Sequence, residues 1–424
     1  MLDRIQQAQL PYTQDLSPLL REFTLRGKTI ANRILYQPME GCDGTHNGSP
    51  GELTRRRYQR FAQGGPGVIW AEATAVVEEG RANPRQLWLH ENNLDDFAAM
   101  AEEMKSLCFK THGFEPLVLL QLTHSGRYSR PHGPPAPRIA YNSPVFEGDA
   151  PLPQDCIVSD DELFHLEEQF GQAARLAELA GFDGVDIKAC HRYLLSELLS
   201  AHTRPGHYGG SFENRTRMLL NCAKAARAAT SFIITTRMNA YDGFVWPYGF
   251  GVNPGEDIAP DYKQALALVK LLSESCGMEL INITIGNPYV NPHVNRPADT
   301  QQNKAIEPPM EGVARILNSA VVVQKAFPQL AIVSSGLSYL REHSANVAAA
   351  MLEQGQCAFA GFGRLSFAYP NLAQDIVLGT PSPKQYCIAC TKCSQLMRMG
   401  STAGCVVRDE LYRHIYSEAV KSSG

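Results

Sequence analysis

Five side chains with charged or acid–base groups stand together near the middle of the chain. They directly follow the short apolar run Gly184–Ile187, and they are Lys188, Cys190, His191, Arg192 and Tyr193. The run is too short for a helix and begins with glycine, so it predicts a buried strand. Reactive groups gather where strands end in a parallel α/β barrel. The stretch therefore predicts a catalytic site, although residues that only brace the next helix would give the same pattern.

Other predicted strands also end in polar or small residues. Gln121 can donate to and accept from the edge of a planar heterocycle. Arg237 can stabilise the negative charge that a flavin gains near N1 on reduction. Small residues after the last two strands let backbone N–H groups approach a phosphate, and Arg364 adds a fixed positive charge. These small residues are Ser335, Gly336 and Gly363.

Four of the eleven cysteines crowd into one short segment near the end of the chain. Cys387, Cys390, Cys393 and Cys405 have the spacing C-x2-C-x2-C-x11-C. In a reducing compartment such a cluster indicates a metal site rather than disulfides. Four thiolates suit zinc, whereas this spacing is typical of a ferredoxin-like [4Fe–4S] cluster. We favour the iron–sulfur cluster and keep zinc as the alternative.

Eight predicted strands alternate with helices. The strands are Ile34–Gln37, Val68–Ala71, Leu117–Gln121, Gly184–Ile187, Phe232–Thr236, Leu280–Thr284, Leu330–Ser334 and Ala358–Gly361. The helices are predicted near Thr54–Gln63, Leu94–Lys110, Asp160–Ala180, Phe212–Ala229, Pro260–Cys276, Pro309–Phe327 and Leu337–Gln354. This order predicts an α/β fold, with a (β/α)8 TIM barrel at 1–379 and a cysteine-rich tail at 380–424 packed on it. A doubly wound sheet is the alternative, but no G-x-G-x-x-G fingerprint follows a strand.

Composition indicates a globular protein, with 44% hydrophobic and 19% charged residues. The net charge of −4 and the scattered Lys and Arg residues argue against a nucleic-acid surface. The first residues lack the apolar core of a signal peptide, and no apolar run is long enough to span a membrane, so we expect a cytoplasmic protein. The Pro/Gly-rich segment 125–159 is expected to be a long functional loop.

From about Leu25 to Arg408 the chain resembles the Old Yellow Enzyme-like NADH:flavin oxidoreductases. The stretches that carry the resemblance are NRILYQPM, VIWAEATAV, LQLTHSGR, GFDGVDIKACHRYLLSELLSAHTRPGHYGGSFENRTR and GFGRLSFAYPNL. The resemblance implies an FMN at the mouth of a TIM barrel. By position, the flavin ring would be held by Pro38, Met39, Ala73, Gln121 and Arg237. The phosphate end would be held by Ser335, Gly336, Gly363 and Arg364.

The same resemblance assigns roles after the fourth strand. Family members usually place two histidines, or a histidine and an asparagine, there to bind the carbonyl oxygen of the substrate. His191 matches the second position, and Lys188 replaces the first. Lys188 either joins His191 as a point charge or pairs with a carboxylate. Tyr193 matches the proton-donating tyrosine of the family.

Two further positions come from the resemblance. His293, followed by Arg296 and Pro297, is similar to a loop that assists proton transfer in 2,4-dienoyl-CoA reductase, a member of the family. A solvated histidine in a proline-stiffened loop is the alternative. Glu40 occupies a flavin-facing position that is more often Cys, Thr or Gly. His293 therefore joins the predicted catalytic residues, while Glu40 affects the expected potential of the flavin.

The cysteine spacing resembles the iron–sulfur branch of this family, which contains 2,4-dienoyl-CoA reductase and trimethylamine dehydrogenase. That branch usually continues into further nucleotide-binding domains, and we expect this chain to lack them. Electrons would then come from a separate ferredoxin or flavin reductase, with NAD(P)H as a direct or indirect donor. Basic residues of the tail suit an acidic partner, and they are Lys384, Lys392, Arg398 and Arg408.

The expected activity is reduction of the C=C bond of an α,β-unsaturated carbonyl or dienoyl-type substrate, by an FMN-dependent ene reductase with a [4Fe–4S] relay. Tyr193 would protonate the α-carbon, since its ordinary pKa of about 10 keeps the phenol protonated at neutral pH. An amine dehydrogenase or N-demethylase of the trimethylamine dehydrogenase type, and an electron-transfer subunit, are the alternatives. We expect no nucleic-acid or membrane partner.

Overall fold

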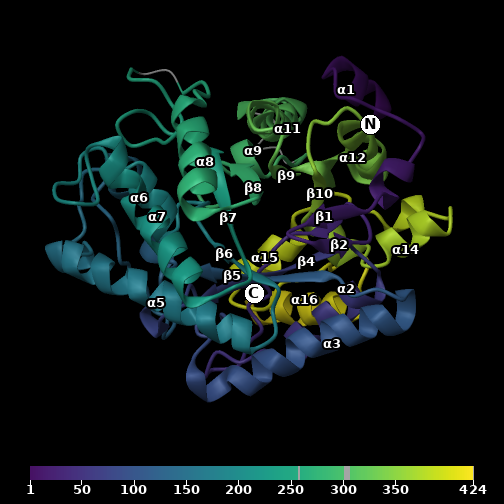
Figure 1. Ribbon diagram of the computed structural model, residues 1–424, viewed down its shortest axis with the longest axis horizontal. Helices are drawn as coiled ribbons and strands as arrows, with labels where there is room; N and C mark the ends of the chain where they lie inside the picture. The colour runs from purple at the N-terminus through teal and green to yellow at the C-terminus, as the bar shows by residue number, and fades with distance from the viewer. Residues whose placement is uncertain (256–257, 300–305, 424) are drawn as a thin grey trace.

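Eight parallel strands close into a barrel in the computed structural model, which describes residues 1–255, 258–299 and 306–423 (Figure 1). The hydrogen-bonded order is β10-β3-β4-β5-β6-β7-β8-β9. The strands are β3 (Ile34–Tyr36), β4 (Val68–Ala75), β5 (Leu117–Thr123), β6 (Gly184–Ile187), β7 (Ile233–Tyr241), β8 (Leu280–Ile285), β9 (Ala331–Ser334) and β10 (Phe359–Phe362). The predicted (β/α)8 barrel is confirmed, and each predicted strand is present.

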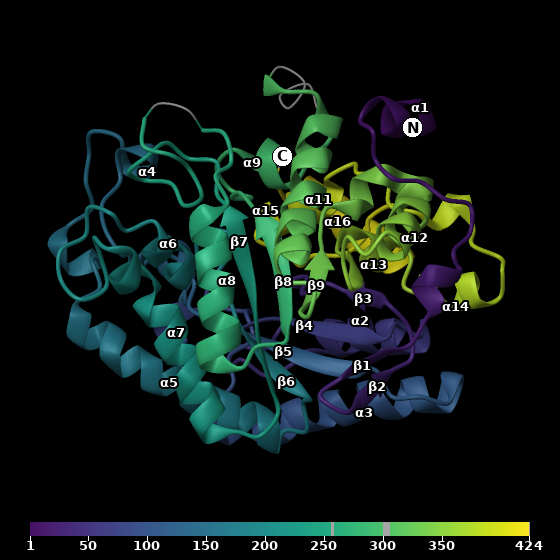
Figure 2. The same cartoon turned by 45° about the horizontal axis from the view of Figure 1, so that its top comes forward.

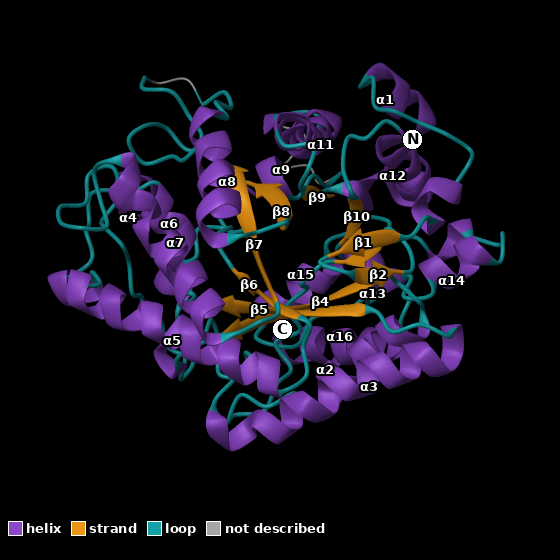
Figure 3. Cartoon of the chain, in the orientation of Figure 1, coloured by secondary structure: helices purple, strands orange, loops and turns teal. Residues whose placement is uncertain are grey.

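Helices surround the strands (Figure 3). They are α1 (Leu2–Gln7), α2 (Glu52–Gln63), α3 (Leu94–His112), α4 (Pro144–Glu147), α5 (Asp160–Leu179), α6 (Leu194–Leu199), α7 (Phe212–Ala229), α8 (Lys263–Cys276), α9 (Pro292–Asn295), α11 (Pro309–Ala326), α12 (Ser344–Glu353), α13 (Arg364–Ala368), α14 (Leu372–Val377), α15 (Lys392–Arg398) and α16 (Glu410–Ser423). The predicted helix at Leu337–Gln354 is wrong in its first half. That half is the 3-10 segment η6 (Leu337–His343), because Arg341 has a φ of 54° that interrupts the helix.

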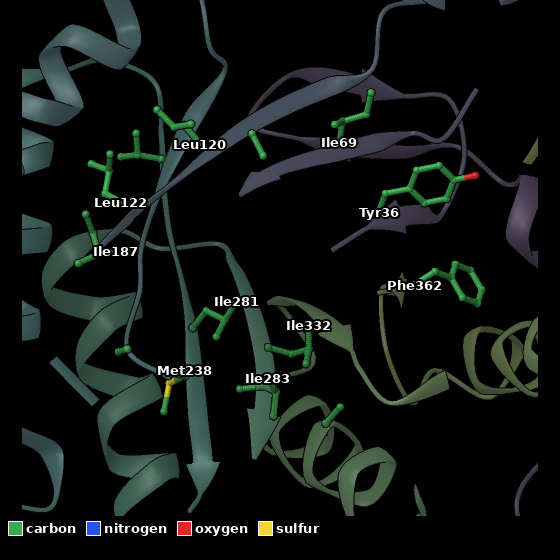
Figure 4. Close-up of a cluster of buried hydrophobic side chains, with 14 of the residues drawn as sticks. Tyr36, Ile69, Leu120, Leu122, Ile187, Met238, Ile281, Ile283, Ile332 and Phe362 are labelled. Atoms are coloured by element: carbon green, nitrogen blue, oxygen red, sulfur yellow. The ribbon is translucent and has the colours of Figure 1, made fainter. Parts of the chain in front are cut away.

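Alternation along each strand divides the apolar side chains between two clusters. Outward residues such as Tyr36, Ile69 and Leu120 pack under the helices (Figure 4). Inward residues such as Leu35, Trp70 and Leu119 fill the amino-terminal half of the barrel. Successive side chains of a strand point to opposite faces, so each inward position recurs two residues later.

The inward positions become polar or small toward the carboxyl ends of the strands. They are Gln37, Ala73, Gln121, Lys188, Arg237, Thr284, Ser335 and Gly363, one for each strand or the residues just after it. In β4 a register shift between Ala71 and Ala73 breaks the alternation. This bulge turns Glu72 toward Arg57 and Tyr58 of α2 and leaves Ala73 facing inward. The fold therefore directs one residue from every strand to the same end of the barrel.

The opposite end of the barrel is covered by a hairpin that the sequence analysis missed. Strands β1 (Phe23–Leu25) and β2 (Lys28–Ile30) pair antiparallel. Leu25 and Ile30 are buried in the same cluster as the inward residues of the barrel strands. The hairpin therefore closes the amino-terminal end, and only the carboxyl end is left for a cavity.

The cysteine-rich tail packs against the loop after β3 and against α2. Asp409 pairs with Arg56, at 2.8 Å, and with Arg60. Ala403 donates its N–H to the carbonyl of Gly41 at 2.7 Å, and the Thr402 hydroxyl donates to the same oxygen at 2.8 Å. These contacts hold the tail near the carboxyl ends of the strands. Within the described part of the chain, no helix has the length and apolar character needed to cross a membrane.

Candidate active site

A cavity of ≈ 1230 Å³ opens at the carboxyl ends of the barrel strands. This volume includes the open mouth of the cavity, which lies where the active sites of α/β barrels are found. All nine residues predicted to hold FMN line it: Pro38, Met39, Ala73, Gln121, Arg237, Ser335, Gly336, Gly363 and Arg364. Lys188, His191 and Tyr193 line it as well, whereas His293 is not among the lining residues.

One side of the cavity is suited to the polar edge of a planar ring. Gln121 donates from its amide nitrogen to Asp186 at 2.5 Å, which leaves its carbonyl oxygen as an acceptor toward the cavity. Arg237 has a buried Nε without a hydrogen-bond partner, and within the described chain it forms no ion pair. A buried N–H without a partner is costly, so this half-buried guanidinium fits an anionic or strongly accepting ligand. The residues therefore fit a flavin ring.

The other side of the cavity is suited to a phosphate. A Cβ at Gly361 would lie 2.0 Å from Nε2 of Gln37, and Gly336 has a φ of +92°, so glycine is required at both positions. Arg364 makes only a long contact of 3.5 Å with the carbonyl of Pro297. Arg296 also lines the cavity, and burial and the neighbouring Arg364 lower its pKa to about 10. Small residues, with two guanidinium groups that have no carboxylate partner in the described part of the chain, fit the phosphate end of FMN.

His191 is held by an unusual backbone segment. His191 and Arg192 have φ values of 63° and 65°, in the left-handed region that such residues seldom adopt. Arg192 stabilises the segment, since its fully buried guanidinium pairs with Asp242 at 3.2 Å. Arg192 does not line the cavity. His191 is thereby turned into the cavity with its Nε2 buried and without a hydrogen-bond partner. Burial, with Arg237 nearby, holds the pKa of His191 well below its usual value, so the imidazole is neutral.

Lys188 and Tyr193 contact each other directly. The Lys188 ammonium lies 3.5 Å from the centre of the Tyr193 ring, and its side chain forms no ion pair with a described carboxylate within 4.0 Å. Burial lowers the pKa of Lys188. Burial and the adjacent Glu40 raise the pKa of Tyr193 well above its ordinary value, so the phenol carries its proton. The expectation that Lys188 pairs with a carboxylate is therefore not met in this structure.

Two residues beside Tyr193 were not among the predicted catalytic residues. Its hydroxyl lies 3.3 Å from Oε2 of Glu40 and 3.1 Å from the hydroxyl of Tyr289. Glu40 had a signal in the sequence, because it follows Pro38 and Met39 at the end of a strand. Tyr289 had none, since it lies in the irregular loop after β8. The structure thus adds a carboxyl group and a second phenol to the predicted group.

The loop after β8 reaches the cavity with different residues from the one predicted. His293 lies in α9, half-buried, and burial lowers its pKa. Its neighbours Tyr289, Asn295 and Arg296 line the cavity instead. Figure 2 shows α9 beyond the carboxyl end of β7, and Arg296 just after α9 donates to the hydroxyl of Ser394 in α15 at 2.8 Å. The structure brings together Lys188, His191 and Tyr193, and leaves His293 outside this group.

A second, smaller pocket of ≈ 370 Å³ is lined by Cys387, Cys390, Cys393 and Cys405. The backbone N–H of Ala389 donates to the sulfur of Cys387 at 3.4 Å, and backbone N–H groups near Val407 lower the pKa of Cys405 against the larger effect of burial. Burial raises the pKa of Cys387 to about 11. Four thiols and N–H donors around one pocket are the chemical groups that bind a cysteine-ligated cofactor.

The cysteine pocket does not contain a compact site for a single ion. Among the described residues, no three His, Cys, Asp or Glu side chains gather closely enough to hold one metal ion. Zn–S bonds of about 2.3 Å would require the sulfur atoms to lie about 3.8 Å apart. Cys393, Arg364 and Phe367 line both this pocket and the large cavity, so the two spaces share a wall.

Comparison with known proteins gives a consistent group of relatives. The family model described as "NADH:flavin oxidoreductase / NADH oxidase family" matches residues 18–305. An "NADPH dehydrogenase" of Geobacillus sp. (strain WCH70) is 32% identical over 63% of this chain and 73% of its own length. An "NADH-dependent flavin oxidoreductase iliE" of Hypocrea jecorina is 27% identical over 84% of this chain and 87% of its own length.

Solved structures share the fold. A 2-naphthoyl-CoA reductase complex matches with a TM-score of 0.77 and 19% identity, over 95% of this chain and 58% of that one. A histamine dehydrogenase from Rhizobium sp. 4-9 matches with a TM-score of 0.70 and 19% identity, over 92% and 52%. An old yellow enzyme homologue from Zymomonas mobilis matches with a TM-score of 0.63 and 22% identity, over 87% and 98%. This chain therefore spans little more than half of the first two and nearly all of the third.

Proposed function

This chain belongs to the NADH:flavin oxidoreductase / NADH oxidase family, and on that premise we propose that it is an FMN-dependent ene reductase for α,β-unsaturated carbonyl or dienoyl-type substrates. It is a flavin-dependent oxidoreductase by membership of the family. The observation that supports ene reduction is that a protonated phenol and a neutral imidazole line the same cavity. Tyr193 offers a proton, and the Nε2 of His191 has no hydrogen-bond partner among the residues that the structure describes.

The cofactor would be held by residues from opposite sides of the cavity. Gln121 and Arg237 would bind the polar edge of the isoalloxazine, and Arg364 with the glycines at 336 and 363 would bind the phosphate. When bound and reduced, FMN supplies a hydride for the β-carbon of the alkene. Arg237 would stabilise negative charge near N1, since it forms no ion pair with the carboxylate of a described residue.

The substrate carbonyl would be bound by His191 and Lys188. His191 can donate one hydrogen bond from a neutral ring, and the Lys188 ammonium adds positive charge on the same side of the cavity. Polarisation of the carbonyl makes the β-carbon electrophilic. Tyr193 then transfers its proton to the α-carbon, which is general acid catalysis. His293, outside the cavity lining, has no role in this proposal.

The cysteine pocket would hold a [4Fe–4S] cluster, ligated by Cys387, Cys390, Cys393 and Cys405. The shared wall between this pocket and the large cavity supports an electron path between the two cofactors. We further propose that a separate acidic protein delivers electrons at this face. Lys384, Lys392 and Arg398 are exposed around the exposed Cys390, which supports such docking. Direct reduction by NAD(P)H is the alternative donor route.

Amine oxidation is the second candidate function. Tyr128, Tyr193 and Tyr289 gather near the cavity, with ring centroids 4.1 Å apart for Tyr128–Tyr289 and 5.9 Å apart for Tyr128–Tyr193. Such rings can bind an ammonium group. However, the Lys188 ammonium already lies over the Tyr193 ring and would repel a cationic amine. The ene reductase is therefore the preferred proposal.

One experiment separates these functions. The protein is purified without oxygen, its flavin is reduced with dithionite, and its reoxidation is followed after mixing with enones or dienoyl thioesters. In a parallel sample the oxidised protein is mixed with ethyl and methyl amines, and reduction of its flavin is followed. We expect rapid reoxidation by an enone or dienoyl thioester. Reduction of the oxidised protein by an amine, without any reaction with the alkenes, would replace the proposal with amine oxidation.

A further inference from the structure

Glu40 is the only carboxyl group among the described residues that line the large cavity. The function proposed above gives it no task. Several cationic side chains also line this cavity, among them Lys188 and Arg237. Glu40 nevertheless forms no ion pair with a described residue within 4.0 Å. Its two oxygen atoms instead have separate and different partners. Oε1 contacts Gln86, and Oε2 contacts Tyr193.

The orientation of Gln86 determines which oxygen of Glu40 can carry a proton. The N–H of Ala82, which can only donate, lies 2.5 Å from Oε1 of Gln86, so this atom is the amide oxygen. Nε2 of Gln86 therefore donates, to Oε1 of Glu40 at 2.7 Å and to the carbonyl of Ala73 at 3.3 Å. Oε1 of Glu40 accepts this hydrogen bond in the role of a carbonyl oxygen, which makes Oε2 the better site for a proton on this carboxyl group. Oε2 is the oxygen that faces the phenol of Tyr193.

The phenol in turn has a connection to the surface. The hydroxyl of Tyr193 lies 3.3 Å from Oε2 of Glu40 and 3.1 Å from the hydroxyl of Tyr289. Tyr289 is 39% exposed, whereas Tyr193 is 2% exposed. The three side chains therefore form a hydrogen-bonded series from a buried carboxyl group, through a buried phenol, to a partly exposed tyrosine, whose own phenol has its pKa raised by burial.

We propose that Glu40 supplies the proton that replaces the one Tyr193 gives to the substrate, an inference that rests on the proposed ene reduction. The O–H bond of Tyr193 breaks as a C–H bond forms at the α-carbon. The Oε2–H bond of Glu40 then breaks as the O–H bond of Tyr193 forms again. Water restores the carboxyl proton through Tyr289 and Tyr193. The substrate gains this proton together with the hydride from reduced flavin, so no further reactant is required.

The electrostatics of the site agree with this geometry. Burial raises the pKa of Glu40, and this effect outweighs the lowering effects of Lys188 and of the hydrogen bonds from Tyr193 and Gln86. Tyr193, Tyr289, Cys42 and Glu72 also face Glu40, and the Gln86 amide is its neutral partner. None of these other titratable groups is a cation. A neutral carboxyl group donates to the phenol oxygen, and the phenol proton is then free to point into the cavity. An ionised carboxylate would draw that proton away from the substrate.

The test uses Glu40→Gln, which keeps the shape and a donor toward Tyr193 but cannot release a proton. Reoxidation of the reduced protein by an enone should be slower by about tenfold or more. The wild-type rate should fall as pH rises through the pKa of Glu40, and the variant should lack this fall. Dithionite reduction should be unchanged in both. Glu79→Gln, at an exposed carboxyl group, is the matched control and should behave as wild type.

A second readout needs no turnover. The infrared difference between wild type and Glu40→Gln at neutral pH should contain the C=O band of one protonated carboxyl group, and this band should be shifted in Tyr193→Phe. The bands of Glu72, Asp186 and Asp242, whose pKa values are also raised, cancel in this difference. A missing band in wild type would overturn the relay, whatever the substrate. Equal enone rates and pH profiles for wild type and Glu40→Gln would also overturn it and leave ene reduction intact. Wild-type protein that reacts with no alkene would instead refute the proposed function. If Glu40→Gln does not fold, the band shift in Tyr193→Phe decides alone.

Discussion

The Lys188 ammonium nitrogen lies 3.5 Å from the centre of the Tyr193 ring. A cation over an aromatic face is stabilised by about 0.5–2 kcal/mol, and it also favours the phenolate that forms when the ring gives up its proton. The two residues are five positions apart, at the end of β6 and just before α6. The contact therefore links the group that would bind the substrate carbonyl to the group that would donate the proton.

Lys188→Met should slow reoxidation of the reduced flavin by an enone about tenfold. The change removes positive charge from both the carbonyl site and the phenol, and 1.4 kcal/mol corresponds to one factor of ten. The measurement is single-turnover kinetics under anaerobic conditions. Lys224→Met, at an exposed lysine in α7, is the matched control. An unchanged rate in Lys188→Met would show that Lys188 acts neither on the carbonyl nor on Tyr193.

Tyr193→Phe should slow the same reaction by about 10²–10⁴-fold, the usual contribution of a positioned acid. Reduction of the flavin by an artificial donor should stay near normal, because the phenol is not required for that step. Tyr128→Phe removes a neighbouring phenol that does not line the cavity, and it should change the rate little. Equal rates for wild type and Tyr193→Phe would assign the proton to another donor, such as water.

Purified protein should contain FMN and about four irons per chain if the four cysteines bind a cluster. Cys390→Ser should lose the iron and retain FMN, because the ion pairs of Asp409 and the bonds of Thr402 hold the tail without the cysteines. Metal analysis and the visible spectrum are the measurements, with Cys156→Ser as the control for cysteine replacement. One zinc and no iron after anaerobic preparation would remove the cluster from the proposal.

Reduction of the flavin through a separate acidic protein should be sensitive to salt and to the charge of the tail. Lys384→Glu should slow reduction by reduced ferredoxin at low salt, since electrostatic attraction raises association rates and is screened by ions. Lys110→Glu, on the exposed face of α3, is the charge-matched control. Rapid reduction by NADH or NADPH alone, equal in wild type and Cys390→Ser, would contradict delivery through the tail.

Asp186 should make stability depend on pH. Burial raises the pKa of its carboxyl group from 3.8 to about 6, so the folded state binds a proton more tightly than the unfolded state. The resulting contribution to the free energy of unfolding is present below pH 4. It is lost as pH rises to about 6, at about 1.4 kcal/mol per pKa unit. Urea unfolding of wild type and Asp186→Asn across this range is the measurement. Parallel curves for the two proteins would show that Asp186 does not titrate in this window.

The strands and most of their chemistry were predictable because they depend on local patterns. Apolar runs bounded by turn residues predicted β3 to β10, and strand ends predicted the residues that line the cavity. The β1–β2 hairpin was missed because its three-residue strands carry too little apolar periodicity. In the loop after β8, sequence similarity indicated His293, whereas the backbone turns Tyr289 and Arg296 toward the cavity.

Contacts between segments that are distant in the chain could not be predicted from the sequence. Glu40 was recognisable as an unusual residue, but the partner of its Oε1 is Gln86, 46 positions away, whose amide is oriented by the N–H of Ala82. The position of the tail likewise depends on pairs such as Arg56 and Asp409, which no local pattern connects. The arrangement of partners is therefore the part of the site that required the structure.

The bonds from Thr402 and Ala403 to the carbonyl of Gly41 restrict how this protein can be recombined with its relatives. Gly41 is adjacent to Glu40, and the tail supplies Cys393, Arg398 and Ala403 to the wall of the large cavity. A chimera that joins this barrel to the tail of another protein would exchange part of the cavity wall and the support of the Glu40 loop at once. Barrel and tail must therefore be exchanged together, and substrate preference should depend on both of them rather than on the barrel alone.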